Sequence, residues 1–207
     1  PLGVRPLCFG SVNGGWIIAS ESCALDNVGA KFVREVNPGE AIMFDSNGFK
    51  SIYQKDTDKC SFCVFEHIYF ARPDSKIDGK LVYKSRLLMG KELAREHPVE
   101  ADMVIGVPDS ATASAVGYSE ESGIPFGEGL VKNRYVGRTF INPDQRMREV
   151  GVKVKLNPLK ELIAGKRLVV VDDSIVRGTT SRPVVSLLRN AGAREIHLRI
   201  CAPPIRF

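Results

Sequence analysis

The sequence predicts an α/β protein in which a parallel sheet carries helices on both faces and follows a β-rich segment. From residue 63 onward, apolar strand-like runs alternate with helical patterns, as they do in parallel sheets. Residues 168–171 form an unbroken apolar run of Leu and Val, which is typical of a strand buried on both faces. Residues 1–59 instead carry short strand-like runs separated by turn residues.

Composition limits the class of protein. The 207 residues suffice for one or two domains, and 43% are hydrophobic, as in a packed soluble protein. No apolar run approaches the roughly 20 residues of a membrane span, so no membrane association is expected. The net charge is +5, but the lysines and arginines are scattered along the sequence and form no basic stripe that would indicate nucleic-acid binding. Five cysteines without a secretion signal favour reduced thiols in the cytoplasm.

The β-rich segment contains three short strand-like runs, at residues 7–9, 15–19 and 41–44. Turn signals at Asn13-Gly14, Pro38-Gly39 and Asn47-Gly48 separate such runs and favour hairpins. Residues 56–59 are polar and suit a linker.

The second segment alternates strands and helices. Its expected strands are residues 63–70, 103–107, 125–126, 168–171 and 195–200. Its expected helices are residues 82–96, a small-residue helix through 115–117 to 122, and a helix from a Ser181 N-cap to Gly192. Residues 132–145 are polar and basic, which predicts a long exposed loop.

Two adjacent carboxylates, Asp172 and Asp173, follow the buried strand. Such a pair can simply begin a turn, or favour the dipole of the next helix. A loop of Gly and hydroxyl residues before a helix suits a phosphate, and the carboxyl ends of parallel strands are where ligands bind. The whole run resembles the phosphoribosyl pyrophosphate (PRPP) motif of type I phosphoribosyltransferases. Its candidate substrate-binding residues are Asp172, Asp173, Ser174, Val176, Arg177, Gly178, Thr179 and Thr180.

A second strand-to-helix turn, Pro108-Asp109-Ser110, should lie at the same edge of the sheet. Ser110 suits either a helix N-cap or a substrate role, and both can hold together. Oxygen ligands from Ser110, Asp172 and Asp173 suit Mg²⁺, which prefers a few protein oxygens together with substrate phosphates and water. We therefore expect one turn to hold the 5′-phosphate and ribose of the ligand, and the other to hold the pyrophosphate and its Mg²⁺.

The basic loop and the cysteines each leave two interpretations. Residues 132–139 are either a solvated basic loop or a lid that brings Lys132, Arg134 and Arg138 to a departing pyrophosphate; the lid is favoured.

Cys60 and Cys63 have CxxC spacing, but no second CxxC or His pair accompanies them, so free buried thiols are favoured over zinc or redox chemistry.

Longer segments resemble the family of glutamine phosphoribosylpyrophosphate amidotransferases. Residues 65–75 (FEHIYFARPDS), 132–141 (KNRYVGRTFI) and 171–181 (VDDSIVRGTTS) are similar to its phosphoribosyltransferase half. Residues 1–7 (PLGVRPL) and 19–25 (ASESCAL) are similar to its glutaminase half. The resemblance implies a type I phosphoribosyltransferase fold at residues 63–207, preceded by a remnant of an N-terminal-nucleophile glutaminase domain at residues 1–62.

The family resemblance implies a purine-synthesis enzyme that forms phosphoribosylamine, pyrophosphate and glutamate from PRPP, glutamine and water through channelled ammonia. It implies Mg²⁺ at Ser110, Asp172 and Asp173, and phosphate contacts from residues 176–180. It further implies purine nucleotide feedback inhibitors and a homo-oligomer, either a dimer or a tetramer. Cys63 stands where one branch of the family has a 4Fe–4S ligand.

Departures from the family pattern define the alternatives. The family's nucleophilic cysteine has no counterpart here, since neither Cys8 nor Cys23 stands at a chain start. With Pro1 as first residue and Phe207 as last, we expect a fragment without glutaminase activity. A PRPP-binding regulator or an incomplete fragment without turnover is the alternative, and a nucleobase phosphoribosyltransferase is disfavoured by the β-rich segment.

Overall fold

The computed structural model describes residues 2–55, 60–133, 135, 155–176, 178 and 180–204. The chain divides by its internal contacts into two units, Pro1–Ser85 and Arg86–Phe207. The domain boundary expected between residues 62 and 63 stays a prediction. No described helix combines the length and the apolar character that crossing a membrane requires.

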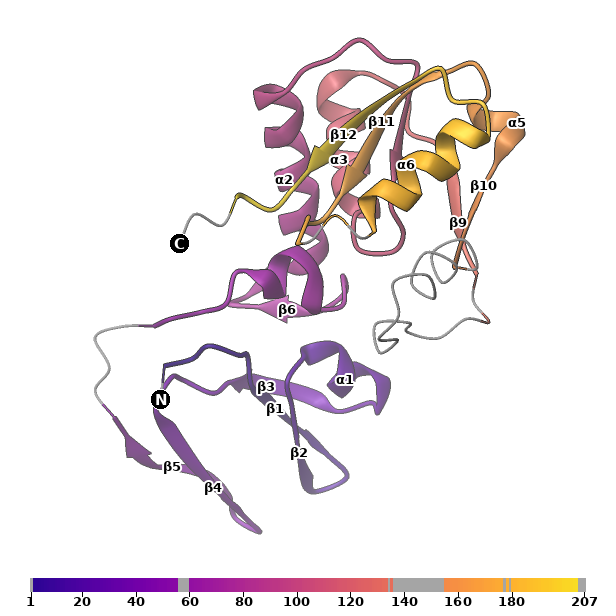
Figure 1. The fold of residues 1–207 in the computed structure, drawn as a ribbon. Coiled ribbons are helices and arrows are strands. Elements are labelled where there is room, and N and C mark those ends of the chain that lie inside the picture. Colours follow the sequence, from indigo (N-terminus) through magenta and orange to yellow (C-terminus); the bar gives the residue numbers. More distant parts are fainter. Residues whose placement is uncertain are drawn as a thin grey trace. The chain divides into compact units, whose positions relative to one another are not determined.

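The C-terminal unit is built on a three-stranded parallel sheet (Figure 1). The strand β11 (Arg167–Asp172) lies between β12 (Glu195–Ile200) and β8 (Met103–Gly106), and both pairings are parallel. Phe126 adds an isolated parallel bridge to Val104. The predicted alternation of strands and helices in this half of the chain is therefore confirmed.

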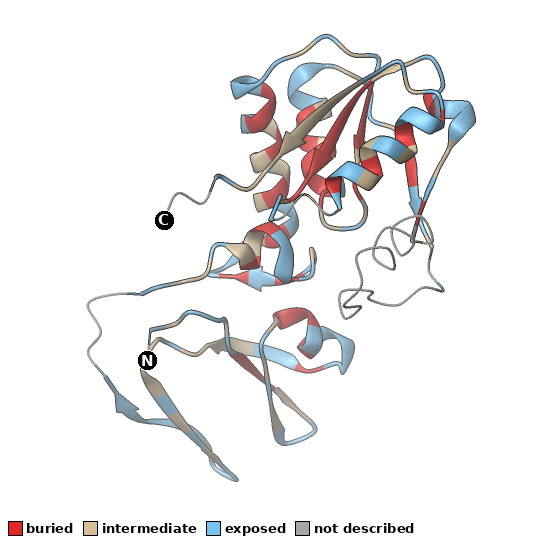
Figure 2. Ribbon diagram, in the orientation of Figure 1, coloured by how far each residue is buried: buried red, intermediate tan, exposed pale blue. Residues whose placement is uncertain are grey.

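Helices cover both faces of this sheet. The helix α6 (Ser181–Asn190) packs on one face, where Leu168 and Val170 lie in a core with Val184 and Leu188. Val169 and Val171 point to the other face, where they pack with residues of α2 (Val82–Glu96) and α3 (Thr112–Ser122). All four central residues of β11 are fully buried, as the continuous apolar run predicts (Figure 2).

The helices α2 and α3 approach each other so closely that their contact requires glycine. A Cβ atom built on Gly90 of α2 would lie 1.9 Å from the Ser114 carbonyl oxygen of α3. A Cβ atom on Gly117 of α3 would lie 2.0 Å from the Leu87 carbonyl oxygen of α2. The first residues of α3 are thus fixed against α2, directly after the turn that carries Ser110.

A short antiparallel ribbon flanks the basic segment. Its strands are β9 (Leu130–Lys132) and β10 (Leu156–Pro158), and the helix α5 (Lys160–Ile163) follows. Residue 134 and residues 136–154, which include most of the expected basic loop, lie outside the described part of the chain. The lid interpretation therefore stays a prediction.

The N-terminal unit is rich in strands, as predicted. A three-stranded antiparallel sheet has the order β2 (Gly15–Ala19), β1 (Cys8–Val12) and β3 (Lys31–Glu35). A separate hairpin pairs β4 (Glu40–Asp45) with β5 (Gly48–Gln54). The turns at Asn13-Gly14 and before Gly48 form hairpins, but the turn at Pro38-Gly39 joins two strands that do not pair with each other. The strand β3 and the helix α1 (Ser22–Asn27) were not predicted.

The prediction of a strand at residues 63–70 is wrong. This stretch contains a π-helix, η1 (Glu66–Phe70), and the short strands β6 (Lys76–Ile77) and β7 (Lys80–Leu81) follow it. Short apolar runs do not distinguish strands from buried helical segments by periodicity alone. Here Glu66 is buried and accepts a hydrogen bond of 2.7 Å from Arg5, a contact far apart in sequence that the local pattern cannot reveal.

Candidate functional site

The acidic pair lies at the carboxyl edge of the parallel sheet. Asp172 is the last residue of β11, and Asp173 follows it directly. Only 7% of Asp172 and 9% of Asp173 is exposed. Two carboxylates that are nine-tenths buried at the end of a central strand differ from the solvated aspartates of an ordinary turn, and buried charges require partners.

Those partners come from the neighbouring turn and from the backbone. The Ser110 hydroxyl donates a hydrogen bond to Oδ2 of Asp173, and the Ser174 hydroxyl donates to Oδ1 at 2.6 Å. The backbone N–H of Asp173 donates to Oδ1 of Asp172 at 2.9 Å. The two strand-to-helix turns thus share one edge of the sheet, as expected, and Ser110 belongs to the same cluster as the acidic pair. Their roles as ligand-binding residues stay predictions.

Backbone hydrogen bonds from the residues after β12 hold the acidic pair, a contact that the sequence alone did not reveal. The backbone N–H groups of Cys201 and Ala202 donate to the carbonyl oxygens of Asp172 and Asp173, at 3.0 and 2.8 Å. These bonds extend the parallel ladder beyond the last strand residues. The strand predicted at residues 195–200 was a signal for this contact, because neighbouring parallel strands end at the same edge.

The electrostatics of the pair favour a cation. Burial, and then the neighbouring charge of Asp173, raise the pKa of Asp172 from 3.8 to about 7. Within the described residues, neither carboxylate forms an ion pair with lysine or arginine. A bound divalent cation would relieve both the burial cost and the mutual repulsion.

The oxygen donors fit Mg²⁺ better than a metal that is held by protein alone. No group of three or more His, Cys, Asp or Glu side chains that could hold a metal occurs in the described part of the chain. Two carboxylates and a serine hydroxyl do meet here, and Mg²⁺ typically keeps several waters and one or two carboxylates together with substrate phosphates. The site therefore suits a magnesium ion that arrives with a phosphorylated ligand.

The phosphate-loop residues are described in part. Ser174 is half-buried, and Val176 is 82% exposed. Gly178 has a φ of 68°, a left-handed conformation that favours glycine. Thr180 occupies the N-cap position of α6, so the N-cap expected at Ser181 is wrong by one residue. Arg177 and Thr179 lie outside the described residues.

Of the three cations proposed from the basic loop, only Lys132 falls within the described residues. It ends β9, and its ammonium forms an ion pair with Asp109, the residue before Ser110. Arg134 and Arg138 lie outside the described residues, so their placement stays a prediction. The structure thus brings one loop cation to the turn that touches the acidic pair.

The CxxC cysteines are free thiols, but the expectation of burial is wrong for Cys60, which is exposed, while Cys63 is half-buried. The N–H groups of Ser61 and Cys63 donate to the carbonyl oxygens of Leu2 and Val4, at 2.8 and 3.1 Å. Alternate amides that face one neighbouring segment indicate an extended backbone. Residues three apart in such a backbone lie too far from each other for a disulfide without rearrangement.

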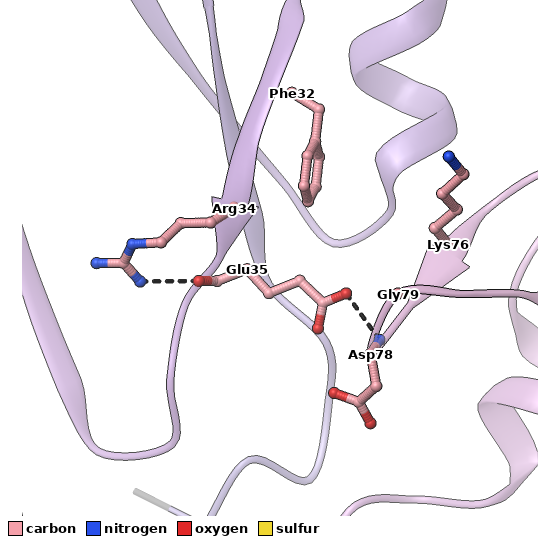
Figure 3. A pocket seen from close by; sticks show the side chains of 6 residues that line it. All are labelled: Phe32, Arg34, Glu35, Lys76, Asp78 and Gly79. Carbon is pink, nitrogen blue, oxygen red and sulfur yellow. Dashed lines mark hydrogen bonds between the residues drawn. The ribbon is translucent and has the colours of Figure 1, made fainter.

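A small cavity in the N-terminal unit contains none of the predicted site residues (Figure 3). Glu35 lines it and accepts a hydrogen bond of 2.8 Å from the N–H of Asp78. Figure 3 shows the Lys76 ammonium and the Asp78 carboxylate pointing away from each other. Its charged groups therefore do not converge on a common ligand position.

The C-terminal unit, with its parallel sheet covered by helices, has the fold of a phosphoribosyl transferase domain. The family model for the phosphoribosyl transferase domain matches residues 88–202, more than half of the chain, and the chain belongs to this family. Amidophosphoribosyltransferase from Mycobacterium tuberculosis (strain ATCC 25618 / H37Rv) is 57% identical over 208 residues, which span 100% of this chain and 39% of the relative. The enzyme of the same name from Archaeoglobus fulgidus is 54% identical and is covered to 45% of its length.

Solved structures show the same similarity. The glutamine phosphoribosylpyrophosphate (PRPP) amidotransferase from B. subtilis, complexed with ADP and GMP, matches with a TM-score of 0.88 and 52% identity. A structure described as the allosteric regulatory enzyme of purine biosynthesis matches with a TM-score of 0.89 and 52% identity. These matches cover all of this chain but only 45% and 44% of the solved chains. The chain therefore spans about two fifths of the length of the curated relatives it matches.

Proposed function

We propose that this chain carries the PRPP-binding and phosphoribosyl-transfer site of an amidophosphoribosyltransferase of purine biosynthesis. One observation carries the proposal: the buried pair Asp172 and Asp173 lies at the carboxyl edge of the parallel sheet, and Ser110 of the neighbouring turn donates a hydrogen bond to Asp173. Hydroxyl groups of a ribose and a magnesium-bound pyrophosphate match this combination of carboxylate and hydroxyl groups. The names of the relatives support the same reaction.

In this proposal the carboxylates of Asp172 and Asp173 differ in their hydrogen-bond partners and therefore in their roles. Asp173 is oriented by Ser110 and Ser174, so its position is fixed before the ligand arrives. The carboxylate of Asp172 accepts only the N–H of Asp173 among the described donors, which leaves one carboxylate oxygen to accept a ribose hydroxyl. The loop with Val176, Arg177, Gly178, Thr179 and Thr180 binds the 5′-phosphate before α6.

The reaction replaces pyrophosphate at C1 of the ribose with ammonia. Neutral ammonia is already nucleophilic, so the protein needs no strong general base. Its contribution is to position PRPP and to stabilise the charge that develops on pyrophosphate. Mg²⁺, held with Ser110, Asp172 and Asp173, would neutralise charge on the pyrophosphate oxygens. Lys132, beside the Ser110 turn, supplies a further cation.

The other expected properties belong to the complete enzyme. Purine nucleotides are proposed as feedback inhibitors, and the B. subtilis relative complexed with ADP and GMP supports this. We further propose a cytoplasmic homo-oligomer that takes ammonia from glutamine, with residues 1–62 as part of the glutaminase domain. Cys63 is half-buried, and no group of three metal-binding side chains lies within the described residues, so the 4Fe–4S proposal rests on the family resemblance alone.

Calorimetric titration with Mg²⁺–PRPP, followed by measurement of pyrophosphate release with ammonia, tests the proposal. We expect saturable binding that requires Mg²⁺ and is lost in Asp173→Asn, with pyrophosphate release that depends on ammonia. Binding without release would favour the PRPP-binding regulator or an incomplete fragment. If no Mg²⁺-dependent binding is detected in a chain shown to be folded by circular dichroism, the proposed function is wrong.

A further inference from the structure

The ion pair between Lys132 and Asp109 joins two functional segments of the C-terminal unit. Lys132 is the last residue of β9, where the basic segment begins, and Asp109 lies one residue before Ser110. The N–H of Ala111 donates to the Val107 carbonyl at 3.3 Å, which closes the turn around Asp109. Because Ser110 donates to Asp173, the ammonium of Lys132 is held within one residue of the acidic cluster.

The ion pair is exposed to solvent. The side chains of Lys132 and Asp109 are 45% and 70% exposed. Exposed pairs contribute little to stability, since water competes with each partner. A ligand with two or more negative charges can therefore exchange with the Asp109 carboxylate, whereas a buried pair would resist exchange.

A second lysine makes this part of the site more positive. Lys155 lies next to the ribbon, and its carbonyl oxygen accepts the N–H of Asn133 at 2.7 Å. Burial and then the charge of Lys132 lower the pKa of Lys155, so the two lysines act on each other electrostatically. Without a ligand, the Asp109 carboxylate pairs with Lys132.

We propose that Asp109 is a displaceable counter-ion for Lys132, which keeps the lysine at the Ser110 turn in the free chain and releases it to the pyrophosphate of the bound ligand. The proposal rests on the proposed function and deepens it. Asp109 acts through Lys132 and is a positioning residue. It lowers the affinity for the polyphosphate anion, because the ligand must displace it.

The test compares dissociation constants for Mg²⁺–PRPP by calorimetry in the full chain. Asp109→Asn removes the charge at nearly constant shape, and we expect binding to become two- to fivefold tighter. Lys132→Met should weaken binding about tenfold. In the Lys132→Met background, Asp109→Asn should change the affinity less than twofold, because the lysine that it competes for is gone.

Glu120→Gln is the matched control. It removes the same charge from a partly exposed ion pair of the same unit, which joins Glu120 of α3 to Lys91 of α2 at 2.8 Å. We expect its affinity to equal that of the unchanged chain. If Glu120→Gln bound Mg²⁺–PRPP as much more tightly as Asp109→Asn does, the change in net charge alone would explain the effect, and the inference would be overturned.

The remaining outcomes also decide the question. Weaker or unchanged binding in Asp109→Asn overturns the inference while leaving the proposed function intact. Equal tightening with and without Lys132 shows direct repulsion of the ligand by Asp109, which overturns the counter-ion role. If the unchanged chain does not bind Mg²⁺–PRPP, both the proposed function and this inference fail.

Discussion

Replacing Asp172 by asparagine should stabilise the metal-free chain at neutral and alkaline pH. In the folded chain, burial and the charge of Asp173 raise the pKa of the Asp172 carboxyl to about 7, against 3.8 in an unfolded chain. Between these values the folded state binds a proton that the unfolded state does not. The free energy of unfolding therefore falls as pH rises through this interval.

The size of the effect follows from the two pKa values. An interval from 3.8 to about 7 corresponds to about 4 kcal/mol, at about 1.4 kcal/mol per pKa unit. Asparagine carries no charge at any pH in this range, and its side-chain oxygen can still accept the N–H of Asp173. The variant should match the unchanged chain near pH 4 and exceed it by up to about 4 kcal/mol near pH 8.

Urea unfolding followed by far-ultraviolet circular dichroism, in EDTA from pH 4 to pH 8, measures this difference. Asp102→Asn is a control of opposite sign, because hydrogen bonds from Arg167 lower the pKa of Asp102 to about 2. That carboxylate contributes stability above pH 3.8, so its loss should destabilise the chain at neutral pH. A difference between Asp172→Asn and the unchanged chain that stays constant with pH would refute the reasoning.

Three further predictions concern the site and its support. Ser110→Ala removes the hydroxyl that orients Asp173, and should weaken Mg²⁺–PRPP binding, measured by calorimetry, about five- to tenfold. Gly117→Ala should lower the free energy of unfolding by about 2 kcal/mol, because its Cβ would collide with a carbonyl of α2; a gain of about 1 kcal/mol, the usual helix preference for alanine, would contradict the close crossing. Burial raises the pKa of Cys201 to about 11, so iodoacetamide at pH 8 should label exposed Cys60 and spare Cys201, as read by mass spectrometry.

The centre of the fold was predictable because its signals are local. The apolar run that became β11 needs burial on both faces to be stable, and two layers of helices are the usual way to provide it. Asp172 and Asp173 come directly after that run, so the strand prediction placed them at the edge of the sheet. The contact with Ser110 followed from parallel topology, since neighbouring strands end at one edge.

Contacts between distant residues explain what the sequence did not reveal. The ion pair of Lys132 with Asp109 joins the end of β9 to the turn after β8, and neither residue type indicates a partner. The π-helix η1 depends on burial of Glu66 against Arg5, which lies far earlier in the chain. Periodicity reports which face of an element is apolar, but it does not report which polar groups a fold brings together.

The same reasoning explains why residues after the first strands pack into the first unit, which extends to Ser85. Oε2 of Glu21 accepts hydrogen bonds from the N–H of Arg72 at 2.7 Å and from the hydroxyl of Ser75 at 2.8 Å. Ser75 is fully buried, so a polar partner is required there. Hydrogen bonds to buried groups between residues far apart in sequence thus hold these segments in one unit.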